Sequence, residues 1–136
     1  MPSTTSGGDV ARSSAGRWRR TARADVEVRP SPVHGRGLYV TREVPAGEVV
    51  SEAPALVLHQ EEADELADHR LAAYLVAWDR SRSAVPFGAL SFVNHGLEAN
   101  AELVVDHDEE VVSLVTTRAV AAGEELTIDY GPEHPV

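Results

Sequence analysis

Short apolar runs separated by proline and glycine dominate the chain after residue 25. Alternation at period two is typical of strands with one buried face. In the first half the pattern predicts short strands at 26–29, 37–41, 48–51 and 55–58. In the last third it predicts a hairpin around an acidic turn and one last short strand, at 101–105, 111–117 and 126–128. We therefore expect a mainly β domain.

The middle of the chain changes period. Residues 61–68 are acidic and compatible with a helix. The apolar positions that follow are spaced by three and four residues, which predicts one buried helix face formed by Leu71, Tyr74, Leu75 and Trp78. Asp68 is the expected N-cap of this helix, and residues 81–86 are expected to end it.

Two similar segments, residues 42–48 and 118–124, each combine a Val-x-Ala-Gly-Glu turn with a preceding arginine. We interpret them as shared turn chemistry between strands, and not as a repeat architecture.

Length and composition narrow the function classes. The chain has 136 residues, which is room for one domain. It has no cysteine, which excludes disulfides, cysteine-bound zinc and a thiol nucleophile. No apolar run reaches the roughly 18 residues that a membrane span needs, and no secretory signal pattern is present. We expect a soluble, cytoplasmic protein that does not contact a membrane.

Charge is distributed unevenly. Residues 1–24 carry five arginines and one acid, a charge of +4, and their low apolar content predicts a disordered basic tail. Residues 25–136 carry seven arginines and 21 acids, a charge of −14. An acidic domain disfavours direct binding of nucleic acid and favours basic partners, although acidity can also serve solubility alone. The chain contains no lysine.

Three motifs could carry chemistry. Gly35-Arg36-Gly37 could bring backbone close to a ligand, or simply form a turn. Asn94-His95, with Asn100 six residues after Asn94, offers amide donors and acceptors; His95 could be a base, a ligand or a polar loop residue. Residues 126–130 end a strand at Tyr130, whose hydroxyl could orient an amine or occupy an ordinary half-buried position.

Metal binding is not expected. The candidate ligands are His95, Asp106, His107, Asp108 and His134, and they lack the spacing of known zinc or calcium motifs.

The order of the three motifs in a mainly β chain resembles the SET-domain family. The resemblance rests on Gly35-Arg36-Gly37-Leu38-Tyr39, then Phe92-Val93-Asn94-His95 with Asn100, then residues 125–130, and it covers about 25–131. It implies a SET fold of small curved β-sheets, a C-terminal pseudoknot and a short variable helical insert at about 59–88. The SET domain would span 25–136. The minimal layout resembles small stand-alone bacterial members.

The resemblance also implies an activity. SET domains are S-adenosylmethionine-dependent methyltransferases that most often act on protein lysine. By resemblance, Gly35, Arg36 and Gly37 would present backbone groups to the methionine part of the cofactor. Asn94 would hold its amino or carboxylate end, and His95 would contact the adenine. Tyr130 would be the catalytic residue beside the methyl group and the incoming amine, and would also contact the cofactor.

Substrate selection is expected from the insert. Its acidic stretch at 61–68 suits a basic protein or peptide, and Tyr74 and Trp78 could line a channel, although a core position is the favoured interpretation. Gly96 stands where the family often has serine, and Leu97 where it often has cysteine. With no cysteine-rich closing segment, the lysine channel could be completed by residues 132–136, by the substrate, or by a second subunit in a homodimer.

Two alternatives stay open at this point. The chain could be a SET-like module that binds basic proteins or the cofactor without turnover, or an unrelated small β protein.

Overall fold

The computed structural model describes residues 25–129. The basic tail 1–24, the catalytic candidate Tyr130 and residues 131–136 lie outside the described part. Strands dominate the described chain, which confirms the mainly β prediction. The elements in chain order are β1 (Val26–Pro30), β2 (Arg36–Val40), β3 (Val49–His59), α2 (Gln60–Glu65), the 3₁₀ helix η1 (Arg70–Tyr74), β4 (Val76–Asp79), β5 (Arg82–Pro86), the 3₁₀ helix η2 (Ala89–Phe92), β6 (Asn94–His95), β7 (Ala101–Asp106), β8 (Val111–Thr116) and β9 (Glu125–Ile128).

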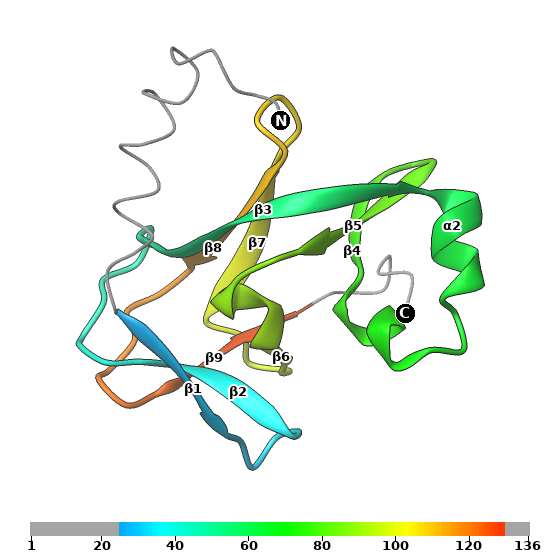
Figure 1. Cartoon of the computed structure of the whole chain (residues 1–136). Helices are drawn as coiled ribbons and strands as arrows, with labels where there is room; N and C mark the ends of the chain where they lie inside the picture. The colour runs from blue at the N-terminus through cyan, green and yellow to red at the C-terminus, as the bar shows by residue number, and fades with distance from the viewer. Residues whose placement is uncertain (1–24, 130–136) are drawn as a thin grey trace.

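The strands form small sheets that share members. The hairpin β1–β2 continues through β9 to β7, β8 and β3, and β3 continues to β5 and β4. Figure 1 shows the β1–β2 hairpin and the α2–β4–β5 region at opposite ends of the molecule, with β3 reaching toward the second. The arrangement agrees with the predicted fold of small curved sheets.

β3 joins two strands that the sequence pattern separates. Its first half, Val49–Pro54, pairs with β8, and its second half, Ala55–His59, pairs with β5. Pro54 lies at the changeover, and the next residue, Ala55, donates to Glu110 O at 2.9 Å. One 11-residue strand therefore bridges the two ends of the domain.

The predicted helix across residues 71–78 is wrong. Helical structure covers α2 and the single turn η1, whose N-cap is His69 and not Asp68. Trp78 belongs to β4, which forms a hairpin with β5 around residues 80–81. The predicted buried face therefore does not form: Trp78 is buried on β4, which pairs with β5, whereas Leu71 and Tyr74 of η1 are 44% and 37% exposed.

The core lies where β2, β8 and β9 meet η2. Its largest fully buried side chains include Leu38, Leu90, Leu114 and Leu126. At roughly 1.5–3 kcal/mol for each buried leucine, this cluster fixes β9 against β2. β9 carries the last predicted motif, so the core determines where that motif lies.

The two similar turn segments lie side by side. Val44 and Val120 exchange backbone hydrogen bonds of 2.9 and 2.8 Å in an antiparallel bridge. Gly47 and Gly123 have φ of 82° and 84°, the left-handed conformation that glycine adopts without steric cost. The shared sequence pattern is therefore shared turn geometry.

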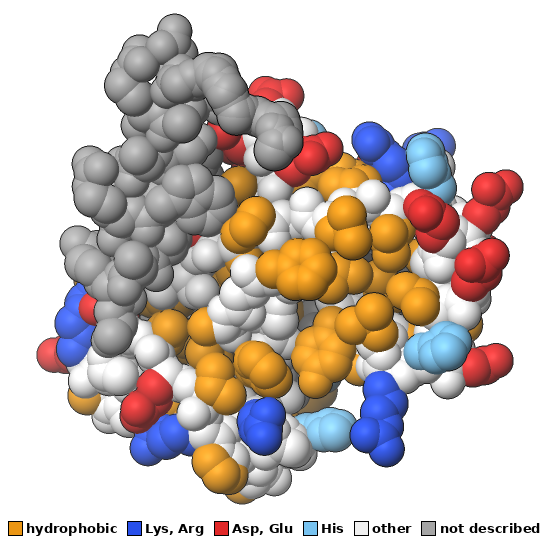
Figure 2. Space-filling view, in the orientation of Figure 1, with side chains coloured by type: hydrophobic (Ala, Val, Ile, Leu, Met, Phe, Trp, Pro, Cys, Tyr) orange, Lys and Arg blue, Asp and Glu red, His pale blue; other side chains and the backbone are white. Residues whose placement is uncertain are grey.

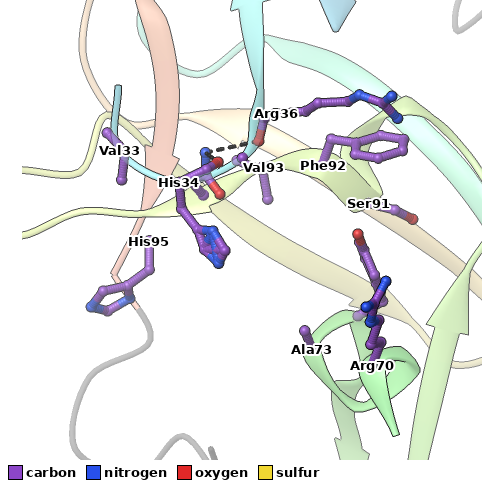
Figure 3. A pocket seen from close by; sticks show the side chains of 12 residues that line it. Val33, His34, Arg36, Arg70, Ala73, Ser91, Phe92, Val93 and His95 are labelled. Atoms are coloured by element: carbon purple, nitrogen blue, oxygen red, sulfur yellow. Dashed lines mark hydrogen bonds between the residues drawn. The ribbon is translucent and has the colours of Figure 1, made fainter. Parts of the chain in front are cut away.

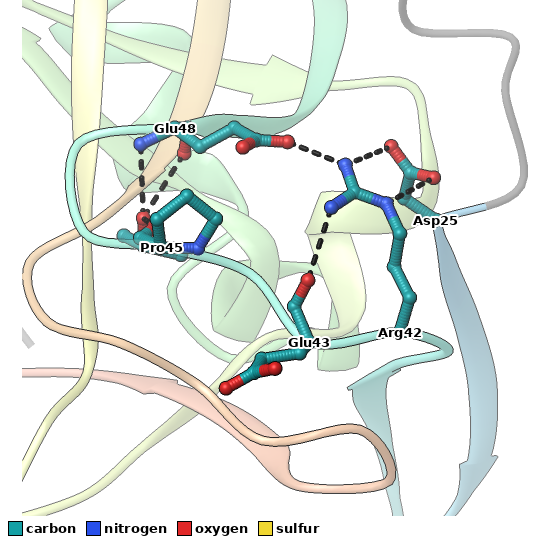
Figure 4. Close-up of polar contacts among 6 residues, drawn as sticks. Asp25, Arg42, Glu43, Pro45 and Glu48 are labelled. Atoms are coloured by element: carbon teal, nitrogen blue, oxygen red, sulfur yellow. Dashed lines mark hydrogen bonds and ion pairs between the residues drawn. The ribbon is translucent and has the colours of Figure 1, made fainter.

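Each of these turns is closed by its own ion pair. Arg42 contacts Glu48 and Asp25 in the first (Figure 4), and Arg118 contacts Glu124 at 3.2 Å in the second. Side-chain hydrogen bonding to Asp25, and then to Glu48, raises the pKa of Arg42 above its already high ordinary value, so this cation stays charged.

Candidate functional site

A pocket of about 630 Å³ lies between the β1–β2 turn, η1 and the η2–β6 segment. Its volume is in the range of small-molecule sites. The lining consists of residues 33–36, Arg70, Ala73, Tyr74 and residues 91–95. In Figure 3, His34 and His95 lie on one side of it, and Arg70 and Ala73 on the other. Gly35, Arg36, Asn94 and His95, predicted from two distant motifs, thus line one pocket.

Gly35 shapes the turn at the pocket's edge. Its φ is 49°, and its carbonyl accepts a hydrogen bond from Ser31 N at 2.8 Å. A left-handed conformation at this position favours glycine. The first glycine of the motif therefore serves the turn that we call the 31–37 loop.

Gly37, the last residue of the motif, does not line this pocket, and its predicted contact with the cofactor stays a prediction. A Cβ at this position would lie 2.2 Å from Glu125 Oε2 and 3.0 Å from Ser31 Cβ. The missing side chain makes room for the Glu125 carboxylate beside β2.

Asn94 connects the 31–37 loop to β9. Its Nδ2 lies 3.0 Å from both His34 O and Arg36 O, 2.9 Å from Glu125 Oε2 and 3.2 Å from Ser31 Oγ. Two carbonyls and a carboxylate can only accept, so chemistry assigns the NH₂ group to this side. Within the described residues Oδ1 makes no hydrogen bond, and as a pocket-lining residue Asn94 can offer it to a ligand.

Glu125 and Ser31 were missed as site residues by sequence reasoning. Ser31 Oγ accepts from Val33 N at 2.9 Å, and its own proton is directed at Glu125, with oxygens at 2.8 and 2.9 Å. Tyr39 Oη lies 3.4 Å from Glu125 Oε1. The signal available was Glu125 itself, an acid at the start of an apolar strand.

Asn100 has a structural position. It is 1% exposed, its Nδ2 donates to Glu125 O at 2.9 Å and its Oδ1 accepts from Thr127 N at 2.9 Å. The side chain thus completes the edge of β9 as a neighbouring strand would. Asn100 holds the third motif in place and does not line the pocket.

β6 brings the second and third motifs together. Asn94 and His95 pair in parallel with Thr127 and Ile128 of β9. This contact between segments far apart in the chain is the one that the predicted pseudoknot requires. Asp129 is the last described residue, so Tyr130 follows the strand that borders His95.

Gly96 packs against the same strand. A Cβ there would lie 3.0 Å from Thr127 Cβ and 3.1 Å from its Oγ1. The glycine at this position allows close approach of the loop after β6 to β9.

The pocket is basic although the chain is acidic. Among the described residues, four of the seven arginines form ion pairs, namely 29, 42, 82 and 118. Arg36 and Arg70 have no acidic partner in the described chain, both line the pocket, and no acid lines it. Two exposed guanidinium groups without acidic neighbours favour an anionic group of a ligand.

The two aromatic candidates in the insert have different positions. Tyr74 lines the pocket and contacts Phe92 edge to face, with ring centroids 6.1 Å apart. Trp78 is buried and packs edge-on against His107 at 5.0 Å. The favoured core interpretation therefore holds for Trp78, whereas Tyr74 belongs to the pocket.

Neither a metal centre nor a membrane-spanning helix is present in residues 25–129. Residues 25–129 contain no group of three or more side chains arranged to hold a metal ion. No helix formed by them combines the length and apolar character needed to cross a membrane.

Comparisons with known proteins place this fold. A family model for the SET domain matches residues 35–131. The chain is 27% identical over 110 residues to the H3 lysine-37-specific histone-lysine N-methyltransferase of Schizosaccharomyces pombe, covering 80% of this chain and 75% of that protein. It is 30% identical over 121 residues to the human histone-lysine N-methyltransferase 2B, covering 82% of this chain but 4% of that protein.

A solved structure agrees on the fold. The crystal structure of a Plasmodium falciparum protein, described as a candidate histone methyltransferase, superposes with a TM-score of 0.67 and covers 82% of this chain and 96% of its own. Sequence identity is 18%, so this likeness bears on the fold alone. With the family model matching most of the described residues and the pocket formed by the expected motifs, this chain belongs to the SET-domain family.

Proposed function

We propose that this protein is an S-adenosylmethionine-dependent methyltransferase that transfers a methyl group to lysine side chains of basic proteins. Membership of the SET family supports the activity, and its relatives in yeast and human are named histone-lysine N-methyltransferases. The observation that carries the proposal is the convergence of Gly35, Arg36, Asn94 and His95 on one pocket.

The pocket's donors and acceptors fit the amino-acid end of this cofactor. Asn94 Oδ1 would accept from its ammonium group, since the amide nitrogen is already committed to the 31–37 loop and Glu125. Arg36 and Arg70 would attract its carboxylate. Val33, Phe92 and the other apolar lining residues would contact the less polar part. His95 and Gly35, at the same pocket, are proposed to contact the cofactor as the sequence predicts, whereas Gly37 would act through Glu125.

The bound cofactor supplies a methyl group activated on a sulfonium sulfur. The lysine nitrogen must attack as the neutral amine, whose formation is unfavourable at neutral pH because the free pKa is about 10.4. A channel that excludes water would lower this pKa. The N–C bond forms as the S–C bond breaks, and the electron pair of that bond stays on sulfur. Tyr130 is proposed to orient the nitrogen lone pair through its hydroxyl.

The surface near the pocket suits a basic substrate. Glu61, Glu62, Asp64 and Glu65 are exposed on α2. Figure 2 shows acidic side chains at the edge of the face where α2 lies, beside a gathering of hydrophobic side chains. A negative rim attracts lysine-rich segments over a range of about 10 Å at moderate salt.

Calorimetric titration tests the cofactor site. Wild type is expected to bind S-adenosylmethionine, and Asn94→Ala to bind it at least about tenfold more weakly, because a hydrogen bond to a charged group is lost. Arg70→Ala is expected to weaken binding in low salt more than in high salt. Unchanged affinity in Asn94→Ala would refute the assignment of this pocket.

Methyl transfer to a mixture of basic proteins tests the catalytic residue. Tyr130→Phe is expected to keep cofactor affinity and lose most of the transfer rate. Tyr74→Phe, the same chemical change, keeps the ring that lines the pocket and contacts Phe92, and is expected to lower the transfer rate much less than Tyr130→Phe does. Cofactor binding without transfer to any protein would instead indicate a binding module without turnover.

The remaining expectations stay predictions. They are a cytoplasmic location, a homodimer that completes the lysine channel, the absence of direct nucleic-acid binding by the domain, and domain limits at 25–136 with a disordered tail at 1–24 and an insert at 59–88.

A further inference from the structure

Glu125 is a half-buried carboxylate without a cation. Among the described residues no arginine or histidine lies within ion-pair distance of it. Its charge is instead met by two close hydrogen-bond donors, Ser31 Oγ at 2.8 Å and Asn94 Nδ2 at 2.9 Å. The Tyr39 hydroxyl also lies 3.4 Å from the carboxylate, but its single proton has a nearer acceptor in Pro30 O at 3.1 Å. A partly desolvated carboxylate that is held only by such donors keeps each donor in place, because the loss of any one of these hydrogen bonds is costly.

The two close donors belong to different segments at the pocket, the 31–37 loop and β6. Ser31 begins the 31–37 loop and accepts the N–H groups of that loop through its oxygen, which leaves its single proton for Glu125. Asn94 is the first residue of β6. Gly37 provides the space for the carboxylate, 2.2 Å from the point where a Cβ would lie. The acid of β9 is therefore the common partner of the two wall segments.

We propose that Glu125 is the positioning residue of this pocket. It holds the Asn94 amide with its NH₂ group facing Glu125, so that Oδ1 remains available to a ligand's ammonium group. Through Ser31 it also holds the 31–37 loop close to Asn94. The proposal rests on the proposed cofactor site and adds the residue that sets its polarity. Glu125 itself does not line the pocket and is not expected to touch the ligand.

Glu125→Gln is the sharpest substitution. The carboxamide keeps the size of the side chain but offers one acceptor oxygen where two close donors converge. If that oxygen faces Asn94, the Ser31 proton loses its acceptor. If it faces Ser31, two NH₂ groups oppose each other, and rotation of the Asn94 amide would turn Oδ1 against the His34 and Arg36 carbonyls. Either arrangement disturbs the ammonium site without removing a side chain that contacts the ligand.

Two stable probes separate positioning from loss of fold. S-adenosylhomocysteine has the amino-acid end, and 5′-methylthioadenosine lacks it. We expect Glu125→Gln to weaken the binding of S-adenosylhomocysteine by about tenfold and that of 5′-methylthioadenosine by less than about twofold. Glu124→Gln is the matched control, because the neighbouring acid contacts Arg118, Ala121 and, at 3.5 Å, Asn100, none of which lines the pocket. It is expected to leave both affinities unchanged.

A second variant covers failure of Glu125→Gln to fold, which thermal unfolding would reveal. Ser31→Ala removes one of the two close donors and is expected to weaken the binding of S-adenosylhomocysteine selectively, by about fivefold. In an Asn94→Ala background, Glu125→Gln is expected to add less than about twofold, since it acts through Asn94.

The outcomes are distinct. Equal weakening of both probes, or no weakening of either, would overturn the positioning role while leaving the proposed function intact. Failure of wild type to bind S-adenosylhomocysteine would overturn the proposed function, and this inference with it. Selective loss of affinity for S-adenosylhomocysteine in Glu125→Gln supports both the proposed function and the positioning role.

Discussion

Replacing Gly37 with alanine should disrupt the domain through one contact. The added Cβ would lie 2.2 Å from Glu125 Oε2, 2.9 Å from its Cδ and 3.0 Å from Ser31 Cβ. The carboxylate would have to leave, which breaks its hydrogen bonds to Ser31 and Asn94. Overpacking costs about 1–3 kcal/mol and a lost hydrogen bond to a charged group about 1.5–3 kcal/mol, so we expect a total of roughly 2.5–6 kcal/mol.

Urea unfolding at neutral pH measures this loss, and thermal unfolding should show a midpoint lower by roughly 10 °C or more. Gly35→Ala is the control at the other glycine of the motif. A Cβ added at Gly35 would lie within 4 Å of no other atom, so the change is opposed only by the φ of 49° at this position. We expect a cost of about 1 kcal/mol. Gly35→Asn should be milder still, because asparagine tolerates this conformation.

A double-mutant cycle identifies the cause. Glu125→Ala removes the atoms that collide with the new Cβ, so Gly37→Ala should cost much less in that background than in wild type. Equal costs in the two backgrounds, or a loss for Gly37→Ala no larger than that for Gly35→Ala, would refute the collision as the explanation.

The remaining predictions concern β9, acid stability and automethylation. Asn100→Ala should destabilise the domain by about 2–4 kcal/mol in urea unfolding, because Glu125 O and Thr127 N lose their partners; a loss below about 1 kcal/mol would contradict its structural role. Hydrogen bonds from the N–H of Ala121, and then from Arg118, lower the pKa of Glu124 in the folded protein. The ionised acid therefore stabilises the fold above its unfolded pKa of about 4.3. This contribution is lost as the pH falls through the lower pKa of the folded state. Between pH 7 and pH 3, Glu124→Gln should therefore lose less stability than wild type, by under about 1 kcal/mol, and identical losses would show that the pair contributes nothing. Since the chain has no lysine, mass spectrometry of enzyme incubated with S-adenosylmethionine alone should find no methylated side chain of that type, and any methylation found there would have to be on another group.

The sequence predicts the fold well where one element explains each pattern. β1, β2, β7, β8 and β9 lie close to the predicted strand ranges. β9 buries alternate residues as a strand with one buried face does, whereas β8 is buried along most of its length and is recognised by its apolar run. The prediction fails in the insert, where the spacing of three and four residues favours a single helix that the structure does not contain. Trp78 is buried there as predicted, but on a strand, because burial alone does not distinguish the two elements.

The site was predicted only in part, and the physical reason differs from the one that applies to the insert. Asn94, His95 and Gly35 were found from local motifs, and the fold places them at one pocket. Glu125, Ser31 and Arg70 could not be found this way, because their importance comes from contacts between segments far apart in the chain. Ser31 and Glu125 are 94 residues apart, and no local pattern links them.

One measurement tests the central claim most directly. A mixture of basic proteins is incubated with this protein and isotopically labelled S-adenosylmethionine, and labelled residues are located by mass spectrometry. We predict labelled methyl groups on lysine side chains with wild type, and their near absence with Asn94→Ala or Tyr130→Phe. Label on no protein, or equal lysine labelling by wild type and both variants, would contradict the claim that this pocket supports lysine methylation.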